Sequence, residues 1–319
     1  MRLYRLKIFY STLTPVPFAG TTLTVGTFDG IHKGHQQIIN RVREQARALG
    51  IQSMLVTFEP HPKIVVQKSG IPETQLLTTI DEKIGILEQM GLDSLVILKF
   101  TPSFATLSAE HFVREKLVEK LRMKSIVIGH DHAFGRNREG DEKLLHTLGR
   151  ELNFSVHTVD PVSASGDKIS STQVRRALQQ GDVAGAARML GRYYSVSGPV
   201  VAGRNQGRKL GFPTANIRPD SAHKLVPMVG IYATTVDIRG TTHESVTYIG
   251  TRPTFAGRQK VVEVHVFDFD ETLYGEPIKV NFCTFLRDDR KFQSPDELIA
   301  TIKKDKKKAM TYFANGGQG

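Results

Sequence analysis

Gly26-Thr-Phe-Asp-Gly-Ile-His-Lys-Gly-His35 is the stretch that decides how the first half of this chain folds. It follows an apolar segment at 22–28, predicted to be a strand, and opens a segment at 31–49 whose apolar residues recur with helical spacing. A glycine-rich turn between a strand and a helix offers free N–H groups and the positive end of the helix dipole. The stretch therefore predicts a phosphate site at the carboxyl edge of a parallel sheet.

Two histidines in this stretch, His32 and His35, are three residues apart, so both should project from the first helical turn. Imidazoles placed there can donate hydrogen bonds to phosphate oxygens and stabilise charge as a P–O bond breaks. The alternative is a glycine-rich turn with incidental histidines, but strand, glycines, histidines and helix coincide here. The residues expected to contact a nucleotide are Gly26, Phe28, Asp29, Gly30, His32 and His35.

Strands and helices alternate outward from this stretch. The expected strands, which are short, apolar and rich in β-branched residues, lie at 22–28, 51–58, 94–100, 125–129 and 154–159. The expected helices lie at 31–49, 81–90, 109–121 and 142–152. This order predicts a Rossmann-like α/β domain with a parallel sheet and right-handed crossovers.

The pattern changes after about residue 190. Apolar and polar residues alternate at 195–202, 231–238, 245–249, 261–269 and 278–286, which predicts an antiparallel β-barrel. A terminal helix follows, capped by Ser294, with Pro295 at its first position and Glu297 at its third. We expect two domains, 1–187 and 188–319.

Composition narrows the class of protein. The 319 residues suffice for two domains, and 39% hydrophobic with 24% charged residues is ordinary for a globular chain. Since no run of about eighteen apolar residues occurs, we expect neither a membrane span nor a membrane partner, and the N-terminus lacks the apolar region of a secretory signal. Cys283 is the single cysteine, which excludes an intramolecular disulfide and favours a cytoplasmic location.

The net charge of +11 raises the alternative of a nucleic-acid-binding protein, which would bind RNA or DNA tightly and with steep salt dependence. The densest basic run is placed near the C-terminus of the predicted last helix, where cations also suit the dipole. We interpret it as a solvated helix end and expect no nucleic-acid partner. The run consists of Lys303, Lys304, Lys306, Lys307 and Lys308.

Two further segments belong to the first domain. Ile169-Ser-Ser-Thr-Gln-Val-Arg175 begins a helix, and Ser171, Thr172 and Arg175 could bind the β- and γ-phosphates of ATP; an ordinary helix capped by Ser170 is the alternative. The His-x-Gly-His pattern resembles that of the nucleotidyltransferase superfamily, shared in looser form with class I aminoacyl-tRNA synthetases, and this favours ATP binding.

The loop between Gly129 and Arg138 holds two more histidines, His130 and His132, but no obvious third ligand, so we expect no metal there. Asp131 of this loop could contact substrate instead.

A second glycine-rich stretch, Gly207-Arg-Lys-Leu-Gly-Phe-Pro-Thr-Ala-Asn216, lies early in the predicted barrel. Thr214 and Asn216 are two apart, so in an extended segment their oxygens face one side and could hold Mg²⁺ beside nucleotide phosphates. The stretch is not a Walker A loop. From the residues alone, a glycine- and proline-rich surface loop is the simpler interpretation.

This stretch resembles the hallmark of riboflavin kinases. Together with the first-domain motifs, it makes nearly the whole chain similar to the prokaryotic bifunctional riboflavin kinase/FMN adenylyltransferases, or FAD synthetases. The resemblance implies that ATP phosphorylates riboflavin to FMN, and that a second ATP adenylylates FMN to FAD with release of pyrophosphate. Other matching pieces are Gly230-Ile-Tyr232, Ile249-Gly-Thr-Arg-Pro-Thr-Phe255, Val262-Glu-Val-His265, Leu273-Tyr-Gly275 and Leu286-Arg287.

The resemblance also assigns roles in the barrel. Glu263 matches the catalytic base that accepts the proton of the ribityl 5′-hydroxyl, and strand alternation places it on the face opposite Val262 and Val264. A solvent-facing strand carboxylate is the alternative. Thr214 and Asn216 match the Mg²⁺ and ATP contacts, and Arg287 lies where the family has a flavin-side arginine. The expected ATP- and flavin-binding set is Gly198, Gly207, Arg208, Gly211, Thr214, Asn216 and Arg287.

One position departs from the family pattern: His132 stands where the family often has an aromatic residue. Three alternatives remain beside the nucleic-acid binder. They are another His-x-Gly-His nucleotidyltransferase, a tRNA-charging relative, and a flavin-sensing regulator that binds flavin without turnover. Riboflavin, FMN and ATP are the expected small-molecule partners, and a homo-oligomer stays open.

Overall fold

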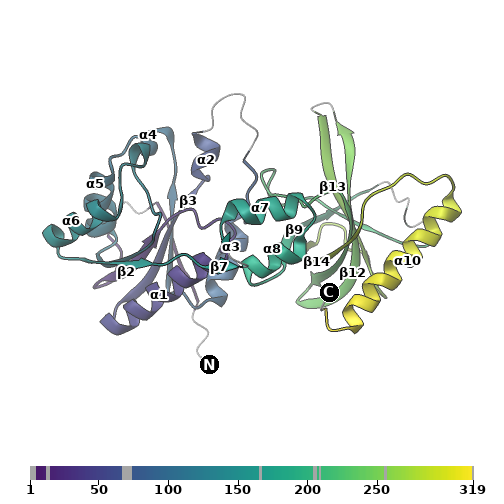
Figure 1. Ribbon diagram of the computed structural model, residues 1–319, viewed down its shortest axis with the longest axis horizontal. Coiled ribbons are helices and arrows are strands. Elements are labelled where there is room, and N and C mark those ends of the chain that lie inside the picture. The colour runs from purple at the N-terminus through teal and green to yellow at the C-terminus, as the bar shows by residue number, and fades with distance from the viewer. Residues whose placement is uncertain are drawn as a thin grey trace. The chain divides into compact units, whose positions relative to one another are not determined.

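Two units make up the chain, Met1–Ser170 and Ser171–Gly319, each with a sheet of its own (Figure 1). The structure is a computed structural model, and it describes residues 5–11, 15–66, 74–164, 167–203, 207, 210–254 and 257–317. In the described residues, no helix has both the length and the apolar character needed to cross a bilayer.

The first unit contains a six-stranded parallel sheet in the order β1-β4-β3-β2-β5-β6. The parallel α/β fold expected from the sequence is confirmed, with β1 as an added edge strand that the pattern did not predict. The strands are β1 (Lys7–Tyr10), β2 (Thr21–Val25), β3 (Gln52–Glu59), β4 (Ser94–Lys99), β5 (Met123–Gly129) and β6 (Ser155–Val159).

Helices cover both faces of this sheet. Along β3, Met54 and Val56 enter one apolar cluster and Leu55 enters the other, because successive residues of a strand point to opposite faces. This explains why the strands are apolar throughout. The helical segments are α1 (Lys33–Leu49), α2 (Pro62–Val65), α3 (Ile80–Gln89), α4 (Pro102–Ala105), α5 (Ala109–His111), η1 (Phe112–Lys120), η2 (Arg136–Arg138) and α6 (Glu142–Leu152). A small hairpin, β7 (Ser163–Ala164) and β8 (Asp167–Lys168), ends the unit.

The second unit is a closed antiparallel barrel in the order β10-β13-β12-β11-β14-β9, as the alternation predicts. The short strand β10 was not predicted. Two helices precede the barrel, α7 (Ser171–Gln179) and α8 (Val183–Leu190), and α8 packs against β14 and β9. The strands are β9 (Tyr194–Val201), β10 (Ala215–Ile217), β11 (Gly230–Ile238), β12 (Thr241–Thr254), β13 (Gly257–Val266) and β14 (Pro277–Arg287).

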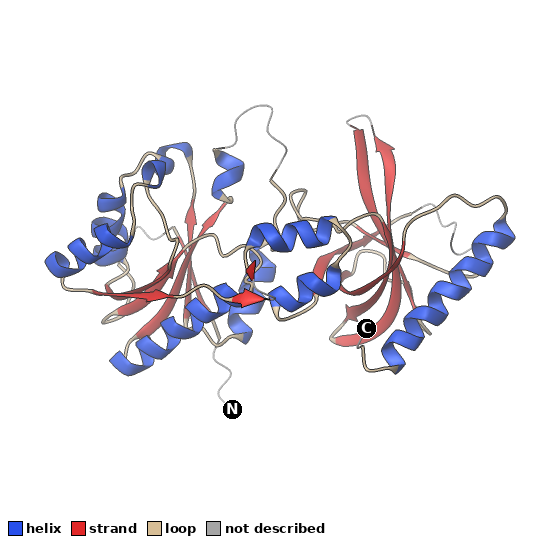
Figure 2. Cartoon of the chain, in the orientation of Figure 1, coloured by secondary structure: helices blue, strands red, loops and turns tan. Residues whose placement is uncertain are grey.

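The terminal helix, α10 (Pro295–Ala314), lies along the barrel (Figure 2) and contacts β11, β12 and β14. Ser294 caps it by accepting a hydrogen bond from the N–H of Glu297, as predicted. The placement of the basic run near the C-terminus of this helix was wrong. The lysines at 303–308 lie in its middle, because Ala309, Tyr312 and Phe313 prolong the apolar face that packs on the barrel.

Candidate active sites

The turn that follows β2 has an unusual backbone. Phe28, Gly30 and Ile31 have φ values of 45°, 85° and 41°, in the left-handed region. This region is costly for a β-branched residue such as Ile31, so the surrounding structure has to hold the turn. Phe28 and Ile31 are both buried, which supplies part of that support.

Asp29 also helps to hold the turn in this conformation. Its carboxylate accepts hydrogen bonds from the N–H groups of Leu77 and Thr78, at 2.9 and 3.0 Å, and the Thr78 hydroxyl accepts one from Gly30 N–H. A buried carboxylate with several N–H donors is well satisfied. Asp29 thus ties the turn to the segment before α3, and its expected contact with nucleotide stays a prediction.

The structure brings the two histidines together, as their spacing predicts. His32 is the N-cap of α1, and its Nδ1 accepts a hydrogen bond from the N–H of His35 at 3.4 Å. The two rings stack with centroids 3.7 Å apart, and the Phe28 ring packs against His35. The N-cap bond leaves the remaining proton of a neutral His32 on Nε2.

His35 lies in an environment that disfavours its charged form. Burial, and then the neighbouring His32 and Lys83, hold its pKa well below the usual range. It is therefore neutral near pH 7. Its Nδ1 atom is buried and has no hydrogen-bond partner among the described residues. A neutral imidazole keeps one N–H donor, so a neutral His35 can still donate a hydrogen bond to a phosphate oxygen.

The other first-domain candidates have different surroundings. Ser171 is the first residue of α7, with Thr172 and Arg175 in its opening turns, and this helix belongs to the second unit. Asp131 forms an ion pair with Lys168 at 2.8 Å, which lowers the pKa of its carboxyl. The functional assignments of these four residues stay predictions.

The loop residue His132 is half-buried, and its ring stacks on Phe134 with centroids 5.4 Å apart. Its Nε2 is buried without a hydrogen-bond partner in the part of the chain that the structure describes. Burial lowers the pKa of His132 to about 4, against the attraction of Asp131. The ring therefore packs as a neutral aromatic group near pH 7.

Three residues of the barrel form a row across neighbouring strands. Asn216 of β10 pairs with Glu263 of β13, and Glu263 pairs with Tyr248 of β12. Glu263 points away from the buried side chains of Val262 and Val264, as the alternation predicts. Its side chain is 24% exposed and carries an ion pair, so it is not merely a solvent-facing carboxylate.

Arg252 hydrogen-bonds to two members of this row, Glu263 and Asn216. Its Nη2 donates to Glu263 Oε1 at 2.5 Å and to Asn216 Oδ1 at 3.2 Å. Arg252 lies four residues beyond Tyr248 on β12, with Gly250 between them on the same strand face. A Cβ at Gly250 would lie 2.3 Å from the Tyr248 hydroxyl, so only glycine leaves room for this packing.

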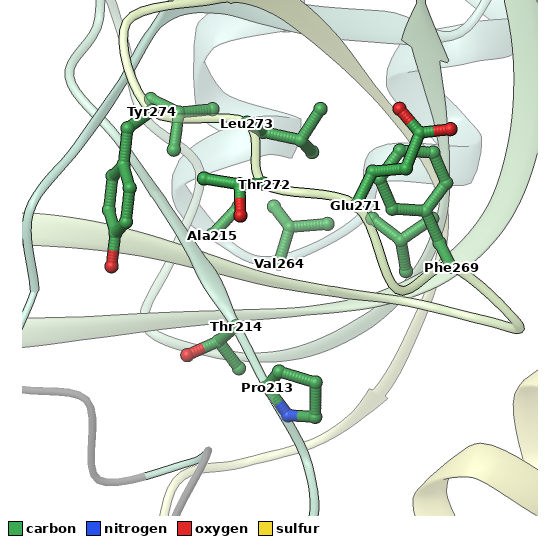
Figure 3. A pocket seen from close by; sticks show the side chains of 11 residues that line it. Pro213, Thr214, Ala215, Val264, Phe269, Glu271, Thr272, Leu273 and Tyr274 are labelled. Carbon is green, nitrogen blue, oxygen red and sulfur yellow. The ribbon is translucent and has the colours of Figure 1, made fainter.

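The segment Pro213–Ala215 faces the loop Phe269–Tyr274 across a pocket (Figure 3). Thr214 lies on its wall, and Val264 and Leu273 are among the apolar residues that line it. The lining combines polar groups, among them the hydroxyls of Thr214 and Thr272 and the carboxylate of Glu271, with several apolar side chains. Such a mixture suits a ligand with a flat apolar part and a polar end.

Glycines allow the backbone to approach these polar side chains closely. A Cβ at Gly203 would lie 2.2 Å from Asn216 Nδ2, and one at Gly207 would lie 2.3 Å from the carbonyl oxygen of Phe212. Gly211 has a φ of 82°, which favours glycine. Arg208, which was expected to bind ATP or flavin, lies outside the described residues.

Two expected binding residues have clear structural partners. Gly198 lies within β9, where an added Cβ would stand 1.9 Å from the carbonyl oxygen of Arg218. Arg287 forms an ion pair with the buried Asp305 of α10, with Nη2–Oδ2 at 2.8 Å and Nε–Oδ1 at 3.0 Å. Their contacts with ATP or flavin stay predictions.

Sequence reasoning missed two charged residues, Arg252 and Lys83. Lys83 had a visible signal, because it lies three residues after Ile80 and four before Leu87, on the apolar face of the predicted helix. The sequence signal for Arg252 was weaker, because only the register of the barrel strands brings Arg252 close to Glu263.

The chain is similar to two protein families, each over a different part of its length. The sequence profile of the FAD synthetase family matches residues 17–173, and that of the riboflavin kinase family matches residues 190–313. A bifunctional riboflavin kinase/FMN adenylyltransferase of Escherichia coli strain K12 is 37% identical over 304 residues, which cover 94% of this chain and 95% of that protein. A protein of the same description from Bacillus subtilis strain 168 is 35% identical over 302 residues, or 93% and 94% of the two chains.

One solved structure matches almost end to end. The crystal structure of a Streptococcus pneumoniae protein described as a macrolide-efflux protein has a TM-score of 0.86 and 30% identity. The match covers 95% of this chain and 98% of that one. The comparison shows that both chains share the same two-part fold, and efflux is a description of the Streptococcus protein alone.

Proposed function

Because the chain belongs to the family of bifunctional riboflavin kinase/FMN adenylyltransferases, we propose that its two sites divide the reactions between them. The chain has riboflavin kinase and FMN adenylyltransferase activities, which use ATP to make FMN and FAD. In the proposal, residues 1–187 carry out the adenylyl transfer and residues 188–319 the phosphorylation. The observation that carries it is the presence of two polar, glycine-bounded groups of residues, one around His32 and His35 and one around Asn216 and Glu263.

In the kinase reaction, Glu263 is the proposed general base. Its carboxylate accepts the proton of the ribityl 5′-hydroxyl while that oxygen attacks the γ-phosphorus of ATP, and ADP leaves. The row from Asn216 through Glu263 to Tyr248 supports this role, since it places the carboxylate beside the proposed ATP ligands. Arg252 holds the carboxylate in this row before substrates bind.

Thr214 and Asn216 would hold Mg²⁺ in this reaction. The fit rests on their oxygens: Thr214 lines the pocket, and Asn216 Oδ1 already accepts from a cation, the Arg252 guanidinium. Among the described residues, no group of three or more His, Cys, Asp or Glu side chains could hold a metal by itself. Two neutral oxygens suit Mg²⁺, which is commonly shared with substrate phosphates; when bound, it neutralises charge on them.

In the adenylyl transfer, a phosphate oxygen of FMN attacks the α-phosphorus of a second ATP, and pyrophosphate leaves. No protein nucleophile is required. His32 and His35 are proposed to stabilise the charge that develops on the phosphates, and the position of both rings at the start of α1, directly after the glycine-rich turn, supports this. Ser171, Thr172 and Arg175 stay proposed ATP ligands, as the resemblance implies.

The proposal places the protein in the cytoplasm, where ATP is abundant and the lone, buried Cys283 stays reduced. Its partners are the small molecules riboflavin, FMN and ATP.

Product analysis tests the proposal. Purified protein is incubated with riboflavin, ATP and Mg²⁺, and flavins are separated by chromatography over time. FMN should appear first and FAD second, and chelation of Mg²⁺ with EDTA should stop the formation of FMN. Binding of flavin without any new flavin product would instead identify a flavin-sensing regulator.

A further inference from the structure

The side chain of Lys83, on α3, lies buried beneath the turn that carries the histidines, with 5% of the residue exposed. Its Nζ donates to the Thr27 carbonyl oxygen at 2.7 Å and to the Thr57 hydroxyl at 2.9 Å. Thr27 belongs to the turn itself and Thr57 to β3. A buried ammonium group is costly, and breaking its interactions destabilises a protein strongly. An apolar side chain would fill this space at a lower cost in free energy. The buried charge therefore indicates a role beyond packing.

Lys83 completes a second anchor for the turn. The first anchor is Asp29, which binds the N–H groups of Leu77 and Thr78 just before α3. The second is the Thr27 carbonyl, which accepts from Lys83 and also from the Thr57 hydroxyl at 3.3 Å. The left-handed residues lie directly after the second anchor. One segment, from Leu77 to Lys83, therefore holds the turn on both sides of Phe28.

The charge of Lys83 also acts on His35. It is one of the groups that lower the pKa of His35 and keep its ring neutral. Burial lowers the pKa of Lys83 itself to about 8, and the charges of Asp29 and Glu59 oppose this shift. At pH 7 the ammonium form predominates, so positive charge lies directly under a turn that is proposed to receive phosphates.

We propose that Lys83 is a positioning residue for the adenylyl transfer, because its ammonium group holds the Thr27 carbonyl and thereby fixes the backbone from which His32 and His35 project. The inference rests on the proposed function of this turn. It assigns Lys83 no contact with substrate. The proposed role depends on the hydrogen bonds and the charge of the ammonium group, and not on the volume that the side chain fills in the core.

The test compares Lys83→Met with Lys143→Met, in which an exposed lysine of α6 in the same unit is changed. The full chain is used, and both activities are measured in each sample. Lys83→Met should lower kcat for conversion of FMN to FAD about tenfold or more, while the KM for ATP changes less than about threefold. The conversion of riboflavin to FMN should be unchanged, and Lys143→Met should match the unaltered protein in both reactions.

A merely structural role would give a different result. Equal loss of both activities, or unaltered FAD formation by a folded Lys83→Met protein, would overturn the proposal. His35→Ala serves as the check on the underlying function: if it leaves FAD formation intact, the proposed role of the turn fails, whatever Lys83→Met does.

The pH profile of the unaltered protein decides the case if Lys83→Met does not fold. The titratable and charged groups that interact with Lys83 are Asp29 of the turn, Glu59 of β3 and His35 of α1, and His35 in turn interacts with His32. The rate of FAD formation should fall as pH rises from 7 to 9, while FMN formation in the same range should not fall in parallel. A rate of FAD formation that stays level over this range would contradict the proposal.

Discussion

Arg252 and Glu263 lie on neighbouring strands of the barrel and form an ion pair, with Nη2 of the arginine 2.5 Å from Oε1 of the glutamate. The same Nη2 lies 3.2 Å from Asn216 Oδ1. The pairing holds the proposed base next to a proposed metal ligand. Because Arg252 is neither a proposed base nor a proposed metal ligand, it offers a way to test the arrangement without removing either.

Replacing Arg252 should affect one reaction only. Arg252→Met leaves the Glu263 carboxylate without its cationic partner, so kcat for riboflavin phosphorylation should fall about tenfold or more. Conversion of FMN to FAD should keep its rate. Steady-state kinetics with riboflavin or FMN as the starting flavin measures both. Arg290→Met, at an exposed arginine of the same unit, is the control and should change neither reaction.

Gly203→Ala should also act on the kinase reaction. An added Cβ would stand 2.2 Å from Asn216 Nδ2, so the Asn216 side chain has to move out of the row with Glu263. We expect a lower kcat for FMN formation and an unchanged rate of FAD formation from FMN. Gly85→Ala is the control, since its Cβ would meet nothing within 4 Å and α3 should gain about 0.5–1 kcal/mol.

Asp29→Asn tests the first anchor of the histidine turn. The N–H groups of Leu77 and Thr78 both donate to Oδ1, and the Leu77 N–H also donates to Oδ2 at 3.1 Å. An amide NH2 in place of Oδ2 cannot accept this bond and meets the Leu77 N–H as a second donor. The expected cost is about 1–3 kcal/mol in the free energy of unfolding. Denaturant unfolding measures it, and FAD formation should fall more than FMN formation. A variant with undiminished stability would show that the first anchor contributes little to the free energy of unfolding.

The surroundings of His132 predict a dependence of stability on pH. Its folded-state pKa is about 4, below its ordinary value near 6.5, so between these values the unfolded chain binds a proton that the folded chain does not. Stability from this group is present above pH 6.5 and is lost as pH falls toward 4. His132→Phe keeps an aromatic ring beside Phe134 and removes the titration. Its free energy of unfolding should therefore fall less between pH 7 and pH 4 than that of the unaltered protein.

Individual residues show which features of the fold and the sites could be predicted from the sequence. The alternation of strands and helices was enough to predict the parallel sheet, and the spacing of His32 and His35 was enough to place both on the first helical turn, because these features depend on local periodicity. The stacking of the two rings was not predicted. Glu263 was placed on the correct strand face for the same reason. The short strand Ala215–Ile217 was missed, because three residues directly after a glycine- and proline-rich stretch carry too little alternation to detect.

Long-range pairing explains the other omissions. Arg252 reaches Glu263 only through the register of β12 with β13 and the missing side chain of Gly250, neither of which is visible in local periodicity. Lys83 is visible in the sequence as a charged residue on an apolar helix face, but its role follows only from the contact of its ammonium group with the Thr27 carbonyl, fifty-six positions earlier. The sequence predicts the elements and their motifs, whereas the contacts that hold each site come from tertiary packing.

The most direct test of two independent sites on one chain is a paired kinetic comparison of Glu263→Ala and His35→Ala, with exposed Glu244→Ala and His146→Ala as matched controls. Each protein receives riboflavin in one experiment and FMN in another, with ATP and Mg²⁺, and its flavin products are quantified. Glu263→Ala should form no FMN from riboflavin yet convert FMN to FAD at the unaltered rate, and His35→Ala should accumulate FMN without FAD. Parallel loss of both reactions in either folded variant would contradict the division of chemistry between the turn and the barrel.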